Sequence, residues 1–209
     1  MMRKFQSATL YALFGLVYPL LARILLALYP DFIFWPVAPT LHMGLLIMAH
    51  LSLATFFYHM LRRHSPKEGL LLFSASALVM TAYTAQAVAF TGYLFNTTTE
   101  RMALPVLRSA GLLVFFFALW RFPKWRSVTG LRKAIPAAWT GSAVAVVLHT
   151  LPFVGHLTHA PLLTQMDASL GGYVPATAVT AALVYFWWVF YRHIPQLYPN
   201  ISDEARQPS

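Results

Sequence analysis

Six polar or ionisable side chains lie inside long apolar stretches of the sequence, where little water is available to solvate them. They are Arg23, His42, His50, Gln86, Arg108 and His149. Such side chains are costly to place within an apolar segment, so they mark candidate sites for ligands, ions or protons. We therefore treat these six residues as the candidate ligand-binding set.

The two arginines give this set a chemical preference. The apolar stretches around Arg23 and Arg108 contain no acidic residue, and the six acidic residues of the chain all lie outside the predicted membrane spans. A guanidinium group binds carboxylate and phosphate groups through paired hydrogen bonds. The sequence therefore favours binding or transport of a small, anionic solute, and it argues against proton coupling through a buried carboxylate.

The histidines allow an alternative, a b-type haem in a membrane redox subunit. Haem iron is commonly held by imidazole, and cationic side chains suit the propionates. His149 paired with His42 or with His50 would supply the two ligands. On the predicted spans, the two histidines of each pair differ in depth by roughly 6 Å at 1.5 Å per residue. Because of this mismatch, haem binding is the alternative to solute binding, and the identity of any cofactor is left open.

Autonomous catalysis is not expected from the sequence. The chain contains no cysteine, which excludes disulfides, thiolate nucleophiles and iron–sulfur ligation by cysteine. Ser142 precedes His149 by seven residues, so the two side chains would lie roughly 10 Å apart along one helix. That separation is too long for the hydrogen bond between a nucleophile and its base.

A metal site also lacks support. His156 and His159 have the i, i+3 spacing of helical metal ligands. However, the nearby Pro152, Gly155 and Pro161 argue against a helix there. The spacing therefore carries little weight, and the metal content is unknown at this stage.

Composition identifies the environment that must position these side chains. The chain has 209 residues, of which 58% are hydrophobic and only 10% are charged. Soluble domains carry about 25% charged residues. So few charges cannot cover a surface facing water, so we predict an all-α integral membrane protein.

Six apolar stretches are long enough to cross a bilayer, which needs about 20 helical residues. We expect one six-helix transmembrane domain over residues 1–194 and a polar, flexible cytoplasmic tail over 195–209. The predicted spans are about 8–28, 40–61, 70–95, 102–120, 134–155 and 173–191.

Basic residues alternate between the loops and predict the orientation. Lys and Arg are enriched in cytoplasmic loops of membrane proteins. Only Arg101 lies in the loops assigned to the outside. We therefore expect both termini in the cytoplasm of a bacterial inner membrane, with the candidate set collected in the outer half. The twelve basic residues on the inner side are Arg3, Lys4, Arg62, Arg63, Lys67, Arg121, Lys124, Arg126, Arg132, Lys133, Arg192 and Arg206.

Small residues predict which helices pack closely. Ala137, Gly141 and Ala145 form a stripe at i, i+4 spacing that continues to His149. Such a stripe lets another helix approach. We expect the third, fifth and sixth spans to pack tightly, and we expect Pro19 and Pro152 to interrupt their helices.

The expected partners follow from the same reasoning. The lipid bilayer is the main one, and the net charge of +9 is assigned to topology and lipid headgroups, so no nucleic acid is expected. Short loops and the lack of a soluble domain also fit a subunit of a larger membrane complex. This interpretation remains open beside solute binding.

Overall fold

The computed structural model describes residues 9–17, 21, 37–63, 66–91, 97–160 and 170–197. Within some of these helices the side chains of residues 37–42, 59–63, 90–91, 170–174 and 194–197 lie outside the described part. Throughout the described ranges the chain is helical apart from short turns, and these ranges contain no strand. The predicted all-α class is therefore confirmed for this part of the chain.

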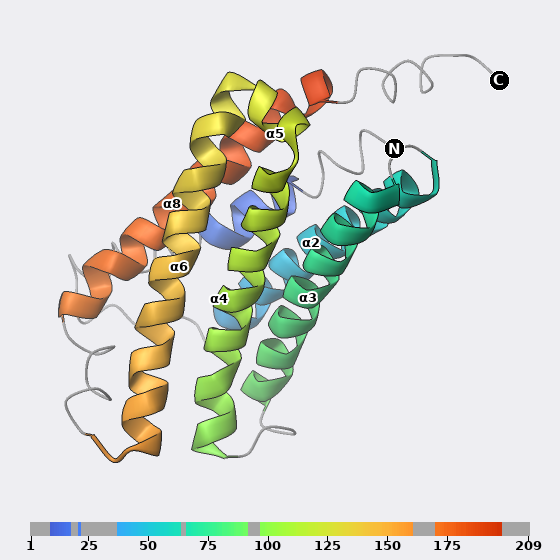
Figure 1. The fold of residues 1–209 in the computed structure, drawn as a ribbon. Coiled ribbons are helices and arrows are strands. Elements are labelled where there is room, and N and C mark those ends of the chain that lie inside the picture. Colours follow the sequence, from blue (N-terminus) through green and yellow to red (C-terminus); the bar gives the residue numbers. More distant parts are fainter. Residues whose placement is uncertain are drawn as a thin grey trace.

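Five long helices and one short helix follow a helical segment at residues 9–17. Figure 1 shows α2 beside α3, α4 between α3 and α6, and α8 crossing α6 at an angle. The short α5 connects α4 to α6 at one end of the bundle. The bounds are α2 Val37–Arg63, α3 Pro66–Thr91, α4 Thr98–Arg121, α5 Pro123–Ser127, α6 Thr129–Leu157 and α8 Leu170–Leu197.

Three helices are long and apolar enough to cross a membrane: Pro66–Ala89, Thr98–Arg121 and Thr129–Leu157. The shortest of these have 24 residues, or roughly 36 Å at 1.5 Å per residue, against a hydrocarbon core of about 30 Å. The chain therefore has the helices of a membrane protein. Six spans and cytoplasmic termini remain predictions.

Two helices begin earlier than predicted, and this changes the position of two acids. Glu68 lies in the first turn of α3 and Glu100 in the first turn of α4. Thr97 caps α4, because its hydroxyl accepts from the Glu100 amide at 3.2 Å while its own amide donates to the Glu100 carboxylate at 3.1 Å. Carboxylates are stabilised at helix N-termini. The expectation that no acid falls within a membrane-spanning helix is therefore wrong for the candidate spans.

The C-terminal part of α6 also differs from the prediction. Pro152 is buried inside a continuous helix that runs to Leu157, so it does not break α6, and His156 is helical. Pro152 has no N–H, so the carbonyl of Leu148 lacks its usual helical donor. His156 contacts Thr99 across the bundle through Nε2 and the hydroxyl, 3.2 Å apart. Pro19 lies outside the described residues.

Glycines permit two close helix contacts. A Cβ added at Gly141 would lie 3.3 Å from the Cβ of Ala182, so α6 and α8 approach closely as predicted. A Cβ at Gly111 would lie 3.3 Å from a Val79 methyl group, which shows the corresponding approach of α4 to α3. However, α3 packs on α2 and α4, and α6 and α8 are not among its main neighbours. The predicted tight packing of the third span with the fifth and sixth is therefore wrong.

Aromatic rings fill the bundle at the end where α5 lies. Trp125 is fully buried and stacks on Phe190, with ring centroids 5.5 Å apart. Its indole N–H donates to Glu68 Oε1 at 2.8 Å, which pairs the buried carboxylate. Burial lowers the pKa of the neighbouring Lys124, while the charge of Glu68 raises it. This end of the bundle is thus closely packed and its buried acid has a partner.

Candidate functional site

A pocket of about 110 Å³ lies where the helices of the bundle meet. Residues from six helical segments line it: residues 9–17 and helices α2, α3, α4, α6 and α8. Each helix contributes side chains from the face that it turns inward. The lining residues are Leu16, Leu46, Tyr83, Arg108, Ser109, Leu112, Ala145, Leu148, His149, Ala176, Val179, Thr180 and Leu183.

Arg108 brings a positive charge to this pocket. Its side chain is half-buried, and one guanidinium nitrogen donates to Gln86 Oε1 at 2.8 Å. The guanidinium carbon lies 5.7 Å from the centre of the Tyr83 ring, a distance suited to a cation–π contact. Both partners are neutral, so neither compensates the charge. Two of the six predicted site residues, on α3 and α4, are therefore in direct contact.

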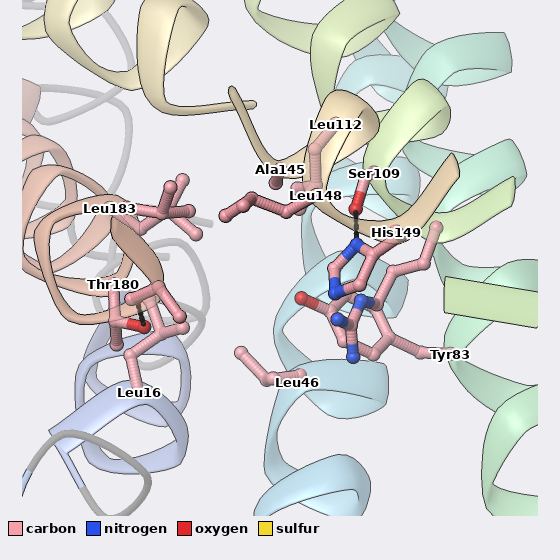
Figure 2. A pocket seen from close by; sticks show the side chains of 13 residues that line it. Leu16, Leu46, Tyr83, Ser109, Leu112, Ala145, Leu148, His149, Thr180 and Leu183 are labelled. Carbon is pink, nitrogen blue, oxygen red and sulfur yellow. Dashed lines mark hydrogen bonds between the residues drawn. The ribbon is translucent and has the colours of Figure 1, made fainter. Parts of the chain in front are cut away.

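Ser109 and His149 form the second polar contact of the pocket. The serine oxygen lies 2.8 Å from His149 Nδ1 and joins α4 to α6 (Figure 2). Ser109 is buried, and His149 is half-buried. Because Arg108 and Ser109 are consecutive in α4, the two polar contacts lie at one level of the bundle. His149 thus points into the bundle, as the small-residue stripe of α6 predicts.

The opposite wall of the pocket is mostly apolar. Figure 2 shows Leu16, Thr180 and Leu183 across the pocket from His149 and Tyr83. The hydroxyl of Thr180 donates to the carbonyl of Ala176 in its own helix at 2.9 Å. The pocket therefore has a polar, cationic side on α3, α4 and α6 and an apolar side on residues 9–17 and α8.

His50 lies outside this pocket lining. It is buried among aromatic rings, stacked on Tyr83 at 5.9 Å and edge-on to Phe115 at 5.5 Å and Trp187 at 5.9 Å. Within the described part of the chain its Nδ1 has no hydrogen-bond partner. Tyr83 therefore contacts both His50 and the guanidinium of Arg108.

The two remaining predicted site residues cannot be placed against the pocket. Arg23 lies outside the described residues, and His42 lies on α2 with a side chain outside the described part. The structure therefore brings together Gln86, Arg108 and His149, and it separates His50 from the pocket.

The pocket does not fit a haem held by His149 and His50. Pockets for drug-sized ligands measure roughly 300–1,000 Å³, and this one measures about 110 Å³. His50 also lies outside the pocket lining, in contact with the rings of Tyr83, Phe115 and Trp187. The pairing of His149 with His42 lies outside the described side chains. Among the described residues, no group of three or more His, Cys, Asp or Glu side chains could hold a metal ion.

Two residues of the pocket lining, Ser109 and Tyr83, were not singled out from the sequence. Ser109 is a small hydroxyl residue in an apolar helix, where such residues normally serve in packing. Its position next to Arg108 was the only indication in the sequence that it lines a polar site. Tyr83 precedes Gln86 by three residues, which places both on one face of α3.

Comparisons with protein-family models, with curated proteins and with solved structures found no match for this chain, so the function must be inferred from the pocket itself.

Proposed function

We propose that this chain binds a small, anionic solute in the pocket around Arg108 and provides a site for its passage through the membrane. The observation that carries the proposal is the guanidinium of Arg108, which lines the pocket and, within the described part of the chain, interacts with the neutral side chains of Gln86 and Tyr83. A partly desolvated charge of this kind attracts a counter-ion. The solute would provide that negative charge.

The size of the pocket limits the solute. A buried cavity of about 150 Å³ accommodates benzene or xenon, and the pocket here measures about 110 Å³. A monovalent anion of one to five heavy atoms is therefore the class that fits, such as a halide, nitrate, formate or acetate. Ser109 and His149 would offer further hydrogen bonds to oxygen atoms of such an anion.

The predicted topology gives the site a direction. Arg108 lies ten residues after Thr98, or roughly 15 Å from that end of α4 and 20 Å from the other at 1.5 Å per residue. Arg121 ends the helix at its far end, and Lys124 and Arg126 follow it. If this end faces the cytoplasm of a bacterial inner membrane, the pocket lies in the outer half of the bilayer.

Anion binding by the purified protein tests the proposal. We expect small anions to raise the thermal unfolding temperature in a concentration-dependent manner, and we expect Arg108→Gln to remove this response. Arg101→Gln is the matched control, because Arg101 lies on the same helix but does not line the pocket. An equal response of Arg108→Gln and the unsubstituted protein would reject the site.

Passage through the membrane is a separate step of the proposal and needs a separate measurement. Proteoliposomes loaded with the anion that binds best should release it, and Arg108→Gln should slow the release while Arg101→Gln does not. Binding without flux would restrict the role to solute binding, or to a subunit of a larger complex. Purification in mild detergent would then show whether another membrane protein accompanies the chain in fixed stoichiometry.

One observation favours a second candidate function, acyl-ester hydrolysis. The distance of 2.8 Å between Ser109 and His149 is that of a nucleophile and its base. The serine oxygen would bond to the carbonyl carbon while His149 takes its proton and passes it to the departing alcohol. Water would then hydrolyse the acyl-serine. From the sequence, Ser142 was judged too far from His149 to serve as its nucleophile, and in the structure its hydroxyl donates to the carbonyl of Ala138 instead.

A fluorophosphonate probe separates this candidate from anion binding. Labelling that is lost in Ser109→Ala and retained in Ser142→Ala would identify a nucleophilic serine. An absence of labelling in the unsubstituted protein, with a normal anion response, would leave Ser109 with a binding and packing role.

A further inference from the structure

A second, larger hollow lies on the outside of the bundle, away from the pocket of Arg108. It measures about 340 Å³ and is lined by Phe117 and Trp120 of α4 and by Pro136 and Trp139 of α6. Phe117 is 54% exposed and Trp139 is 42% exposed, so the hollow opens to the surroundings of the bundle. Since both helices are candidate membrane spans, these surroundings are lipid. We call the hollow lined by these four residues the surface groove.

Arginines extend both walls of the surface groove towards the basic end of the bundle. Arg121 follows Phe117 by four residues, and Arg132 precedes Pro136 by four residues, so each lies on the same helix face as its groove residue. Arg126 of α5 places its guanidinium carbon 5.3 Å from the centre of the Trp120 ring. All three arginines are exposed. The apolar groove therefore ends at a cluster of positive charge.

Pro136 adds a hydrogen-bond acceptor at the same place. A proline has no N–H, so the carbonyl four residues earlier in the helix loses its usual donor. That carbonyl belongs to Arg132, one turn from the groove on the side of the three arginines. It would accept a hydrogen bond from a hydroxyl group of a ligand that the arginines hold.

We propose that the surface groove binds one anionic phospholipid, with an acyl chain against the four groove residues and the phosphate between Arg121, Arg126 and Arg132. The combination of an apolar groove in two membrane helices with a cationic end matches both parts of such a lipid. Basic sites between membrane helices on the cytoplasmic side are suited to anionic headgroups. A headgroup that carries hydroxyls, such as phosphatidylglycerol, would also reach the Arg132 carbonyl.

The same end of the bundle contains an internal control. Arg192 of α8 lies 4.7 Å from the centre of the Trp188 ring, so it forms the same kind of contact as Arg126 with Trp120. Neither Arg192 nor Trp188 lines the surface groove. A general attraction of exposed arginines for anionic lipid would involve both Arg126 and Arg192, whereas a specific site at the surface groove would involve Arg126 and not Arg192.

Native mass spectrometry of the purified protein with added phosphatidylglycerol or phosphatidylcholine tests this proposal. We expect one tightly held phosphatidylglycerol, and we expect the double change Arg126→Gln with Arg132→Gln to weaken its binding about tenfold or more. Arg192→Gln should leave it unchanged. Equal binding of the two lipids, or equal weakening by Arg192→Gln, would overturn the proposal.

Two further arms address the acyl chain. Glycerol phosphate has the same charged group without a chain, so it should not displace the lipid at comparable concentrations. Trp139→Ala removes one groove wall without changing the charge and should also weaken lipid binding. Displacement by glycerol phosphate, or unchanged binding in Trp139→Ala, would show that the arginines alone bind phosphate and that the groove is not a lipid site.

Discussion

The two halves of the bundle are built in different ways. Around Arg108 the small residues Ser109, Ala145 and Ala176 stand among larger side chains, and a pocket of about 110 Å³ remains. Around Trp125, helices α2, α4, α5 and α8 contribute large rings that contact one another. The ring contacts there join Phe57, Phe115, Phe116, Trp125, Phe186, Trp187 and Phe190.

The charged groups of the two halves also differ in their surroundings. The buried carboxylate of Glu68 receives the indole N–H of Trp125 at 2.8 Å. The guanidinium of Arg108 also has partners, but these are neutral and a pocket lies beside it. A filled half stabilises the fold, and a hollow half whose charge has neutral partners among the described residues can bind a ligand. We therefore expect changes in the first half to affect stability and changes in the second to affect binding.

Trp125→Ala should have the largest effect on stability. The change removes a fully buried ring that stacks on Phe190, and it leaves Glu68 without its donor. Large-to-small changes of this type cost about 3–5 kcal/mol. Thermal unfolding of the detergent-solubilised protein, followed by circular dichroism, measures the loss.

Trp125→Phe is the control for the packing contribution, because it keeps a ring and removes only the N–H. We expect a smaller loss of about 1–3 kcal/mol, the cost of an unpaired buried acceptor. If both variants lose the same stability, the hydrogen bond to Glu68 and not the ring packing stabilises this half. If neither loses stability, the contrast between the halves is wrong.

Gly141→Leu should have the next largest effect on stability, and it should also reduce anion binding in the half that contains the pocket. A Cβ at this position already approaches Ala182 to 3.3 Å, so a larger side chain must move α6 away from α8. Overpacking of this kind typically costs about 1–3 kcal/mol. Because Ala145 and Val179 line the pocket close to this contact, anion binding should fall together with stability.

Gly44→Leu is the matched control for that change. Gly44 also lies within a helix, but nothing lies within 4 Å of a Cβ built there. We expect its unfolding temperature and anion response to remain near those of the unsubstituted protein. A comparable loss in both variants would indicate a general sensitivity of the helices to leucine and would remove the argument for a specific α6–α8 contact.

The inward direction of His149 was predictable from the sequence, whereas the packing around it was not. The apolar stretches and the small-residue stripe before His149 follow from helix periodicity, so the direction of His149 into the bundle could be predicted. The first residues of α3 and α4 could not be predicted in this way. Glu68 and Glu100 interrupt the apolar pattern, yet both lie in the first turn of their helices, where carboxylates are stabilised. The partner of Trp125 was missed for the same reason.

Contacts between helices were the least predictable feature. Gln86 and Arg108 are 22 residues apart and Ser109 and His149 are 40 apart, and no local pattern relates them. Their contact depends on the rotation of each helix about its axis, which is set by close approaches such as that of Gly111 to Val79. Periodicity identifies the inward face of a helix, but it does not identify the neighbour that this face meets.

His50 lies at the boundary of the two halves, and its replacement should have a moderate effect of the opposite sign. Its Nδ1 is buried and has no partner among the described residues, which costs free energy in the folded state. His50→Leu removes this polar atom and keeps an apolar contact with Tyr83, Phe115 and Trp187. We expect an increase in stability of about 1 kcal/mol.

The anion response distinguishes the possible roles of His50. It should be unchanged in His50→Leu, because His50 does not line the pocket. A loss of binding or flux together with higher stability would show that the imidazole acts in the transport path. His50 would then belong to the half that contains the pocket.

Ser109→Ala should have the smallest effect on stability and a clear effect on the pocket. It removes the cross-helix contact with His149, and such hydrogen bonds between membrane helices contribute about 0.6 kcal/mol on average. Ser142→Ala is the matched control, because the Ser142 hydroxyl bonds within its own helix to Ala138. Release of His149 from Ser109 should change the anion affinity in the first variant only. A change in both variants would mean that the hollow half responds to any loss of a buried hydroxyl, and a change in neither would assign the Ser109–His149 contact to packing.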